Sequence, residues 1–232
     1  LAGHLKNDAS FDPFRDLLRH HILKNCHIPA GEAVLGYTLP ERRLHAVTSF
    51  SKAVGVGSKL AKQFLLDAQA IDASDQRPDS RQLFDAGSVV ELAVLIPQLV
   101  GLKEMGLGMN ATRSELFSLR DDGILPQRFP LLPLKNQWVI ADGLAIVKEL
   151  TKLASPVSID ELGWETIQAA RRRKLILVAN IIEAIRNRRL ALGQRGGETG
   201  YHSFCVREDE INALATERVR TDPSSKQRKG KS

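Results

Sequence analysis

The chain has little cysteine, few aromatic residues and no long apolar run, and each shortage excludes a class of protein. Two cysteines in 232 residues, Cys26 and Cys205, cannot form the disulfide framework of a small secreted domain. The longest apolar stretch, residues 89–100, is interrupted by Glu91 and Pro97 and is too short to span a bilayer. We therefore expect a cytoplasmic protein without membrane contacts.

Catalytic and metal-binding signatures are also missing. Acidic residues are scattered, so no carboxylate cluster resembles the two-metal site of a nuclease or transposase. The one metal-like group consists of His20, His21, Cys26 and His27. Its two adjacent histidines point in different directions on a helix, and no C-x-x-C pair completes a tetrahedral site. The segment 106–111 matches G-x-G-x-x-A, but no buried strand precedes it as a dinucleotide site requires. We expect neither an enzyme nor a metal or other cofactor.

Positive charge, by contrast, is concentrated. The net charge is +6, and residues 171–195 carry eight Arg and Lys against the single acid Glu183. The end of the chain, residues 217–232, adds six more against two acids, so the remainder is net negative. A basic end on an acidic body indicates a polyanionic partner such as nucleic acid. The alternative is a solvated charged face with a disordered tail.

A glycine pattern occurs twice, 51 residues apart, as Gly55-Val-Gly57 and Gly106-Leu-Gly108. In both copies a short apolar helix is expected before the glycines and an amphipathic helix after them. A tight glycine turn between two short helices is typical of helix-turn-helix units, whose second helix fits the DNA major groove. We expect Ser58 and Asn110 to cap these second helices. Leu60, Phe64, Leu116 and Phe117 are among their expected buried residues.

The resulting fold prediction is a mostly α protein, built from tandem helix-turn-helix or winged-helix-like modules with short β wings. Each module is expected to run helix, turn, helix, strand or hairpin, helix, as in small excisionase or MerR-type proteins. In the third, the basic cluster Arg171–Lys174 replaces the glycine turn, and a hairpin over 190–206 forms a glycine-rich wing. The expected divisions are an N-terminal helical segment at 1–40, module 1 at 41–99, module 2 at 100–154, module 3 at 155–216 and a disordered basic tail at 217–232.

The candidate DNA contacts lie on the polar faces of these modules. Module 1 offers Ser58, Lys59, Lys62 and Gln63, and module 2 offers Asn110, Thr112, Arg113 and Ser114. Module 3 offers Arg171, Arg172, Arg173, Lys174, Arg186, Arg188, Arg189 and Arg195. Arg and Lys reach guanine edges or phosphates, while Asn and Gln pair with adenine. Module 3 presents Val178, Ala179, Asn180 and Glu183 on its second helix, which suits a phosphate clamp better than a base reader. Ordinary solvated helices, or helices that dock proteins, remain the alternative.

Residues 126–134 hold three prolines and many apolar side chains. A free wing would be polar, so we expect this segment to pack on a neighbouring module or on another protein. Double-stranded DNA is the principal expected partner, and a homodimer is compatible with the pattern.

Several stretches together resemble the C-terminal half of TniQ/TnsD-family transposition proteins. They are Phe14–His21, Gly31–Gly36, the two Gly-apolar-Gly modules and, above all, Leu190–Val206. The resemblance covers about residues 11–215 and is carried by hydrophobic spacing and module order. Members usually carry zinc-binding Cys/His motifs ahead of this region, which this sequence lacks. The resemblance implies a non-catalytic factor that selects a DNA target for transposition and contacts a transposition ATPase or transposase. A transcriptional regulator, an excisionase-like protein and a protein-interaction scaffold are the alternatives.

Overall fold

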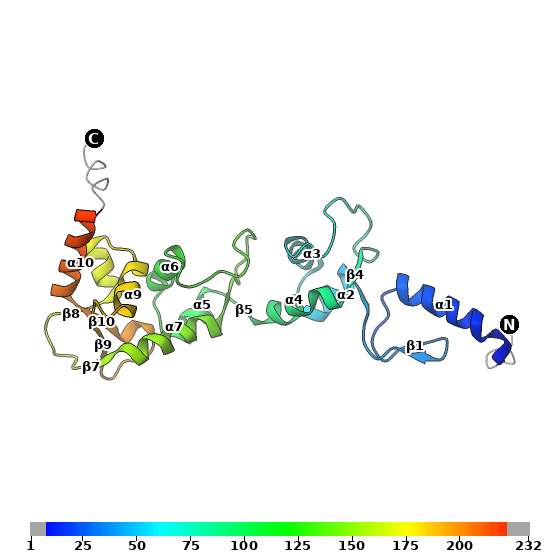
Figure 1. Ribbon diagram of the computed structural model, residues 1–232, viewed down its shortest axis with the longest axis horizontal. Coiled ribbons are helices and arrows are strands. Elements are labelled where there is room, and N and C mark those ends of the chain that lie inside the picture. The colour runs from blue at the N-terminus through cyan, green and yellow to red at the C-terminus, as the bar shows by residue number, and fades with distance from the viewer. Residues whose placement is uncertain (1–7, 222–232) are drawn as a thin grey trace. The chain divides into compact units, whose positions relative to one another are not determined.

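The computed structural model describes residues 8–221, with side chains through 217, and its regular structure is mostly helical with small sheets. The chain divides into two compact units, Leu1–Gln98 and Leu99–Ser232 (Figure 1). Module 1 lies in the first unit, whereas modules 2 and 3 share the second. The last helix, α10 (Glu208–Thr221), continues into the segment predicted to be a disordered tail, and the rest of that segment lies outside the described residues.

One order of elements occurs three times. Each copy contains a strand, an eight-residue helix, a three-residue turn, a second helix, a strand that pairs antiparallel with the first, and a closing helix. The first copy comprises β3 (Leu44–Ala46), α2 (Val47–Val54), α3 (Ser58–Asp67), β4 (Leu83–Asp85), the 3-10 turn η3 (Gly87–Val89) and α4 (Val90–Leu95). The second comprises β5 (Leu99–Val100), α5 (Leu102–Met109), α6 (Arg113–Asp121), β6 (Trp138–Val139) and α7 (Ile140–Leu153). The third comprises β8 (Trp164–Thr166), α8 (Ile167–Lys174), α9 (Val178–Arg186), β9 (Leu192–Arg195), η5 (Tyr201–Ser203), β10 (Phe204–Arg207) and α10.

The turns between the paired helices are alike in conformation but not in sequence. Each begins with a left-handed residue: Gly55 (φ 72°), Asn110 (φ 48°) or Leu175 (φ 53°). The predicted caps Ser58 and Asn110 are therefore wrong, because Gly57 and Thr112 are the N-cap residues. The predicted turn at Arg171–Lys174 is also wrong, since these residues form the last turn of α8.

The second glycine pair does not turn the chain at all. Gly106 and Gly108 lie inside α5, and a Cβ on Gly106 would crowd the Ala111 carbonyl oxygen at 3.1 Å. A Cβ on Gly108 would lie 3.4 Å from Ile140 of α7. Glycine here allows close packing, and Asn110, which tolerates the left-handed region, makes the turn instead.

Leu175 is the unusual member of the turn set. A leucine in the left-handed region costs roughly 1 kcal/mol, and this side chain is 82% exposed, so burial offsets little of the cost. We expect Leu175→Asn to raise the free energy of unfolding by about 0.5–1 kcal/mol. Thermal unfolding of both proteins measures the change. Leu162→Asn is the matched control, because Leu162 is equally exposed but has no positive φ; an equal gain there would refute the strain argument.

The first unit has a small aromatic core. Phe50 of α2, Phe64 of α3 and Phe84 of β4 are buried, while Leu60, expected to be buried, is only half-buried. His45 stacks on Phe84 at 6.0 Å between ring centroids. Burial, and after it the charge of Arg42, lowers the pKa of His45.

The predicted N-terminal helix is α1 (Asp12–Asn25). It follows η2 (Ala9–Phe11) and precedes the hairpin of β1 (Ala33–Val34) and β2 (Tyr37–Thr38). None of the residues of α1 is buried.

The second unit has one core shared by modules 2 and 3. Met105, Leu119 and Ile146 of module 2 belong to the same buried cluster as Ile167, Ile181 and Phe204 of module 3. The strand β7 (Ser155–Val157), which follows α7, pairs in parallel with β9 and completes a sheet of order β7-β9-β10-β8. Burial of continuous apolar surface and backbone pairing thus join two helix pairs into one body.

The predicted hairpin of module 3 exists, but its tip is not a free wing. β9 and β10 pair antiparallel, with Phe204 opposite Gln194. Gly200 in the connection lies so close to module 2 that a Cβ there would sit 2.4 Å from the Met109 carbonyl oxygen. The connection between the strands is therefore part of the module interface.

Candidate nucleic-acid interface

The front of α9 is covered by module 2. The Val178 backbone N–H, at the first residue of α9, donates to Oδ2 of Asp122, just beyond α6. Val178, predicted to face outward, is buried together with Ile181, Ile182, Ala184 and Ile185. A carboxylate at a helix N-terminus satisfies a free N–H and complements the helix dipole. The second helix of module 3 is consequently a core element whose N-terminus a DNA groove cannot reach in this conformation.

This cap gives a direct stability test. Asp122→Ala leaves the Val178 N–H without its acceptor, so we expect the free energy of unfolding to fall by about 1–2 kcal/mol. Asp121→Ala is the control, because Asp121 is exposed and pairs with its neighbour Arg120 at the surface, an interaction worth little. Urea denaturation followed by circular dichroism compares the two. Equal small losses would mean that the cap contributes nothing beyond surface charge.

Two of the predicted contacts on module 2 are engaged within the protein. The Asn110 side-chain amide donates to the Thr199 carbonyl oxygen at 2.6 Å. The Thr112 hydroxyl donates to Oε2 of Glu115 at 2.8 Å and caps α6. Oε1 of Glu115, whose side chain is buried, lies 2.9 Å from Nδ1 of His202 in module 3. Both predicted contacts therefore help to hold the two modules together.

The solvent face of α6 carries arginine instead. Arg113 is exposed, and its guanidinium carbon lies 5.2 Å from the centroid of the Phe117 ring. Arg120 lies over the same ring at 4.6 Å. Phe117 is thus half-buried and in contact with two cations, which corrects its prediction as a core residue. Ser114 is half-buried, with Oγ 3.3 Å from the Thr112 hydroxyl.

On module 1 two of the predicted contacts, Ser58 and Lys62, have partners within the protein, and Oγ of Ser58 lies 3.3 Å from Oγ of Ser51. Nζ of Lys62 lies 3.3 Å from Oδ1 of Asp79 in the segment after α3. That segment is held by Gln82, which is buried and donates to the carbonyl oxygens of Asp75 and Arg77. Lys59 is exposed, whereas Ser58 and Gln63 are half-buried.

The basic residues of module 3 do not form one patch. Arg173 binds the carboxylate of Glu165 and donates to Oδ1 of Asn212 at 2.7 Å. Nε of Arg171 is buried without a hydrogen-bond partner among the described residues, whereas Arg172 is exposed and Lys174 is half-buried. Arg195 lies in β9 and donates to the Trp164 carbonyl oxygen at 3.3 Å. Of the cluster at 171–174, Arg172 is thus the arginine most open to a ligand.

Arg186 at the end of α9 is also paired. Its guanidinium donates to both carboxylate oxygens of Glu149 on α7, at 2.6 and 2.9 Å. This hydrogen bonding lowers the pKa of Glu149 and raises that of Arg186. The pair places the C-terminal halves of α7 and α9 next to each other.

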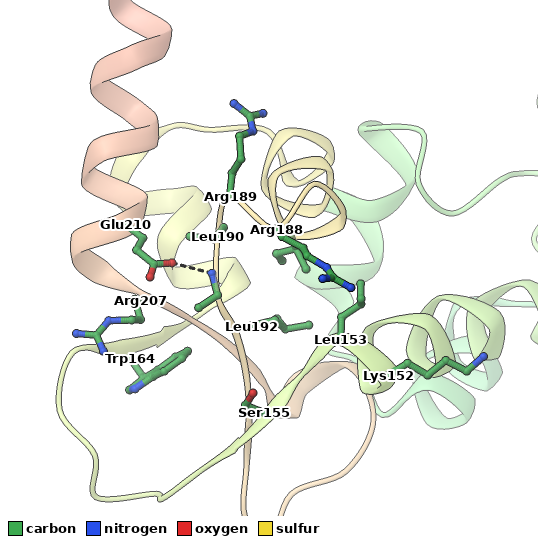
Figure 2. A pocket seen from close by; sticks show the side chains of 12 residues that line it. Lys152, Leu153, Ser155, Trp164, Arg188, Arg189, Leu190, Leu192, Arg207 and Glu210 are labelled. Atoms are coloured by element: carbon green, nitrogen blue, oxygen red, sulfur yellow. Dashed lines mark hydrogen bonds between the residues drawn. The ribbon is translucent and has the colours of Figure 1, made fainter.

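Beside this pair lies a pocket of about 690 Å³ that collects cations from distant parts of the chain. Figure 2 shows its side chains on the two sides of the segment 190–192. The four cations are Lys152 from α7, Arg188 and Arg189 from the turn after α9, and Arg207 from β10. Ile185, Leu190, Leu192, Leu153 and Trp164 supply its apolar surface.

Arg188 and Arg189 were predicted contacts, whereas Lys152, Trp164 and Arg207 were missed. Arg207 ends a strand and Lys152 lies on the helix of another module, so no sequence spacing links them. Arg207 pairs with Asp209 at 3.1 Å, while Lys152, Arg188 and Arg189 make no ion pair with the described residues. A cationic rim around an apolar floor suits an anionic ligand that also has apolar surface.

Across residues 8–221, no set of three or more His, Cys, Asp or Glu side chains is gathered closely enough to hold a metal ion. The same part of the chain contains no helix with the length and apolar character needed to cross a membrane.

Comparisons with protein-family models, with curated proteins and with solved structures give no match, so the resemblance to TniQ/TnsD proteins stays a prediction.

Proposed function

We propose that this chain is a non-catalytic protein that binds duplex DNA and holds its phosphate backbone with the cationic pocket of the second unit. The observation that carries the proposal is that Lys152, Arg188, Arg189 and Arg207, which come from distant parts of the chain, line one pocket. Unpaired Lys and Arg side chains gain affinity for DNA by releasing condensed counterions. Arginine also matches phosphate geometry through two parallel N–H donors.

The repeated strand, helix pair, strand and helix support a duplex as the ligand, because this order is typical of winged helix-turn-helix proteins. The second helices of the first two copies keep Lys59 and Arg113 exposed, and such side chains can read base edges. The proposed role is target selection in transposition, following the resemblance described above. A transcriptional regulator or an excisionase-like protein would use the same surface.

Protein docking is a second candidate function, and residues 126–134 favour it. Phe129 is buried and anchors the segment, and Arg128 pairs with Asp142 at 2.6 Å. Leu131, which follows Phe129 by two residues, has a side chain that is 86% exposed. A held segment that presents an unburied leucine is suited to contact another protein, such as a transposition ATPase or transposase.

Fluorescence anisotropy with a labelled random duplex, repeated over a series of salt concentrations, tests the DNA proposal. We expect binding near physiological salt and a linear fall of log affinity with log salt concentration. Absence of binding under these conditions would refute it. The docking candidate predicts instead that no duplex binding is seen and that Leu131→Ser abolishes capture of the partner protein.

A further inference from the structure

The cationic pocket contains one feature that a phosphate clamp does not need, namely an aromatic wall. Trp164 of β8 is half-buried and lines the pocket together with Arg207, whose guanidinium carbon lies 5.8 Å from the indole centroid. Figure 2 shows Trp164 and Arg207 on one side of the segment 190–192, and Arg188 and Lys152 on the other. An aromatic ring beside Arg207, with further cations across the segment 190–192, matches a base and its flanking phosphates.

The indole is held in place by neighbours on the sheet. Its Nε1–H donates to Oε1 of Glu161 at 2.9 Å. A Cβ on Gly193 of β9 would lie 2.9 Å from Cζ3 of the indole, so glycine leaves room for the ring edge. Because the ring is oriented before any ligand arrives, little side-chain entropy is lost on binding.

The charges of the pocket are unbalanced in favour of an anion. Four cations and one carboxylate, Glu210, line the pocket, and Glu210 accepts a hydrogen bond from the Ala191 N–H at 2.7 Å. Arg207 is paired with Asp209 at 3.1 Å, so Lys152, Arg188 and Arg189 supply the excess positive charge. Leu190 and Leu192 are buried beneath the rim, and Leu153 is partly exposed. An inorganic anion would use the rim but leave the indole and Leu153 in water.

From this arrangement we propose that the pocket binds an unstacked nucleotide of single-stranded DNA. The base packs on Trp164 and the apolar floor, Arg188 binds a phosphate on one side of the segment 190–192, and Arg207 binds the neighbouring phosphate on the other side. This inference rests on the proposed DNA-binding function and assigns a ligand to the same site. Bases in an intact duplex are stacked on one another, so a strand that is open or distorted supplies this ligand.

Tryptophan fluorescence reports directly on this contact, because the chain has two tryptophans and Trp138 is buried. In a Trp138→Phe background, titration with an oligo-dT strand is expected to quench Trp164 saturably. A hairpin duplex without an open end is expected to bind in anisotropy but to quench weakly. Trp164→Leu should lower the single-strand affinity about tenfold, while Trp164→Phe, which keeps a stacking face, should restore most of it.

Arg188→Gln should also lower single-strand affinity severalfold, and Lys103→Gln, which removes an exposed charge from α5 outside the pocket, should not. If Trp164→Leu leaves the affinity for single-stranded DNA unchanged, the inference is overturned. So does equal displacement by a glutamate-rich peptide, which would assign the pocket to acidic proteins. Duplex binding without any Trp164 response would overturn the inference alone and leave the proposed function standing. Single-strand binding without duplex affinity would refute the proposed function and leave the pocket's assignment intact.

Discussion

Changing Arg188 and Arg189 together to glutamine should lower the affinity of this protein for duplex DNA by roughly ten- to a hundredfold at moderate salt. Both side chains are exposed, line the pocket and make no ion pair with the described residues, so their charge is available to phosphate. Each lost phosphate contact should also reduce the slope of log affinity against log salt by about 0.9. Anisotropy over a salt series measures both quantities.

The control for this prediction must remove the same charge from the same unit. Lys103 and Lys135 are exposed and lie outside the pocket, so Lys103→Gln with Lys135→Gln is matched in charge. We expect a small loss of affinity and an unchanged slope for this control. If both double variants lose affinity equally, net charge rather than the pocket determines binding, and the proposed interface is wrong.

Gly200→Ala should be the most destabilising single substitution considered for the second unit. Gly200 has φ 72° and ψ −163°, a region that is essentially restricted to glycine. In addition, a Cβ there would lie 2.4 Å from the Met109 carbonyl oxygen and 2.6 Å from Cβ of Asn110. Since backbone atoms cannot move aside cheaply, we expect a loss of about 3 kcal/mol or more in the free energy of unfolding, measured by urea denaturation.

Gly197→Ala separates the two causes of this loss. Gly197 also has a positive φ of 83°, but no atom lies within 4 Å of a Cβ built there. It should cost about 1 kcal/mol, from backbone strain alone. Equal losses in the two variants would show that contact between the 196–203 connection and module 2 contributes little to stability. A larger loss for Gly200→Ala would establish that contact as a structural joint.

Local patterns were enough to predict much of the element order. The apolar spacing of Phe64 and Leu116 predicted helices with those residues buried, and the structure confirms it. Short apolar runs beside helix caps predicted strands at 83–84 and 138–140, and both strands are present, although Ile140 begins α7 instead of ending the strand. Helical periodicity and strand alternation depend on neighbouring residues, so a sequence reports them directly.

Turn positions were predicted less well, because glycine has two uses. At Gly55 it supplies a left-handed turn, as expected, whereas Gly106 and Gly108 give room for close packing inside α5. The sequence pattern is the same in both places, but a Cβ on Gly106 would meet Ala111 and Leu116, and one on Gly108 would meet Ile140 of α7. Leu175 shows the converse, since nothing in its chemistry marks a left-handed turn.

The sequence by itself determined a mostly helical chain with three helix pairs, short strands and a concentration of arginine near its C-terminal end. Tertiary structure alone decided which of those arginines have no ion-pair partner among the described residues and can bind a ligand. Packing of modules 2 and 3 around one core directs Asn110 and Asp122 into the interface, and ion pairs engage Arg173 and Arg186. The same packing brings Lys152, Arg188 and Arg207 to one pocket. Contacts of this kind join residues that are far apart along the chain, and no local spacing encodes them.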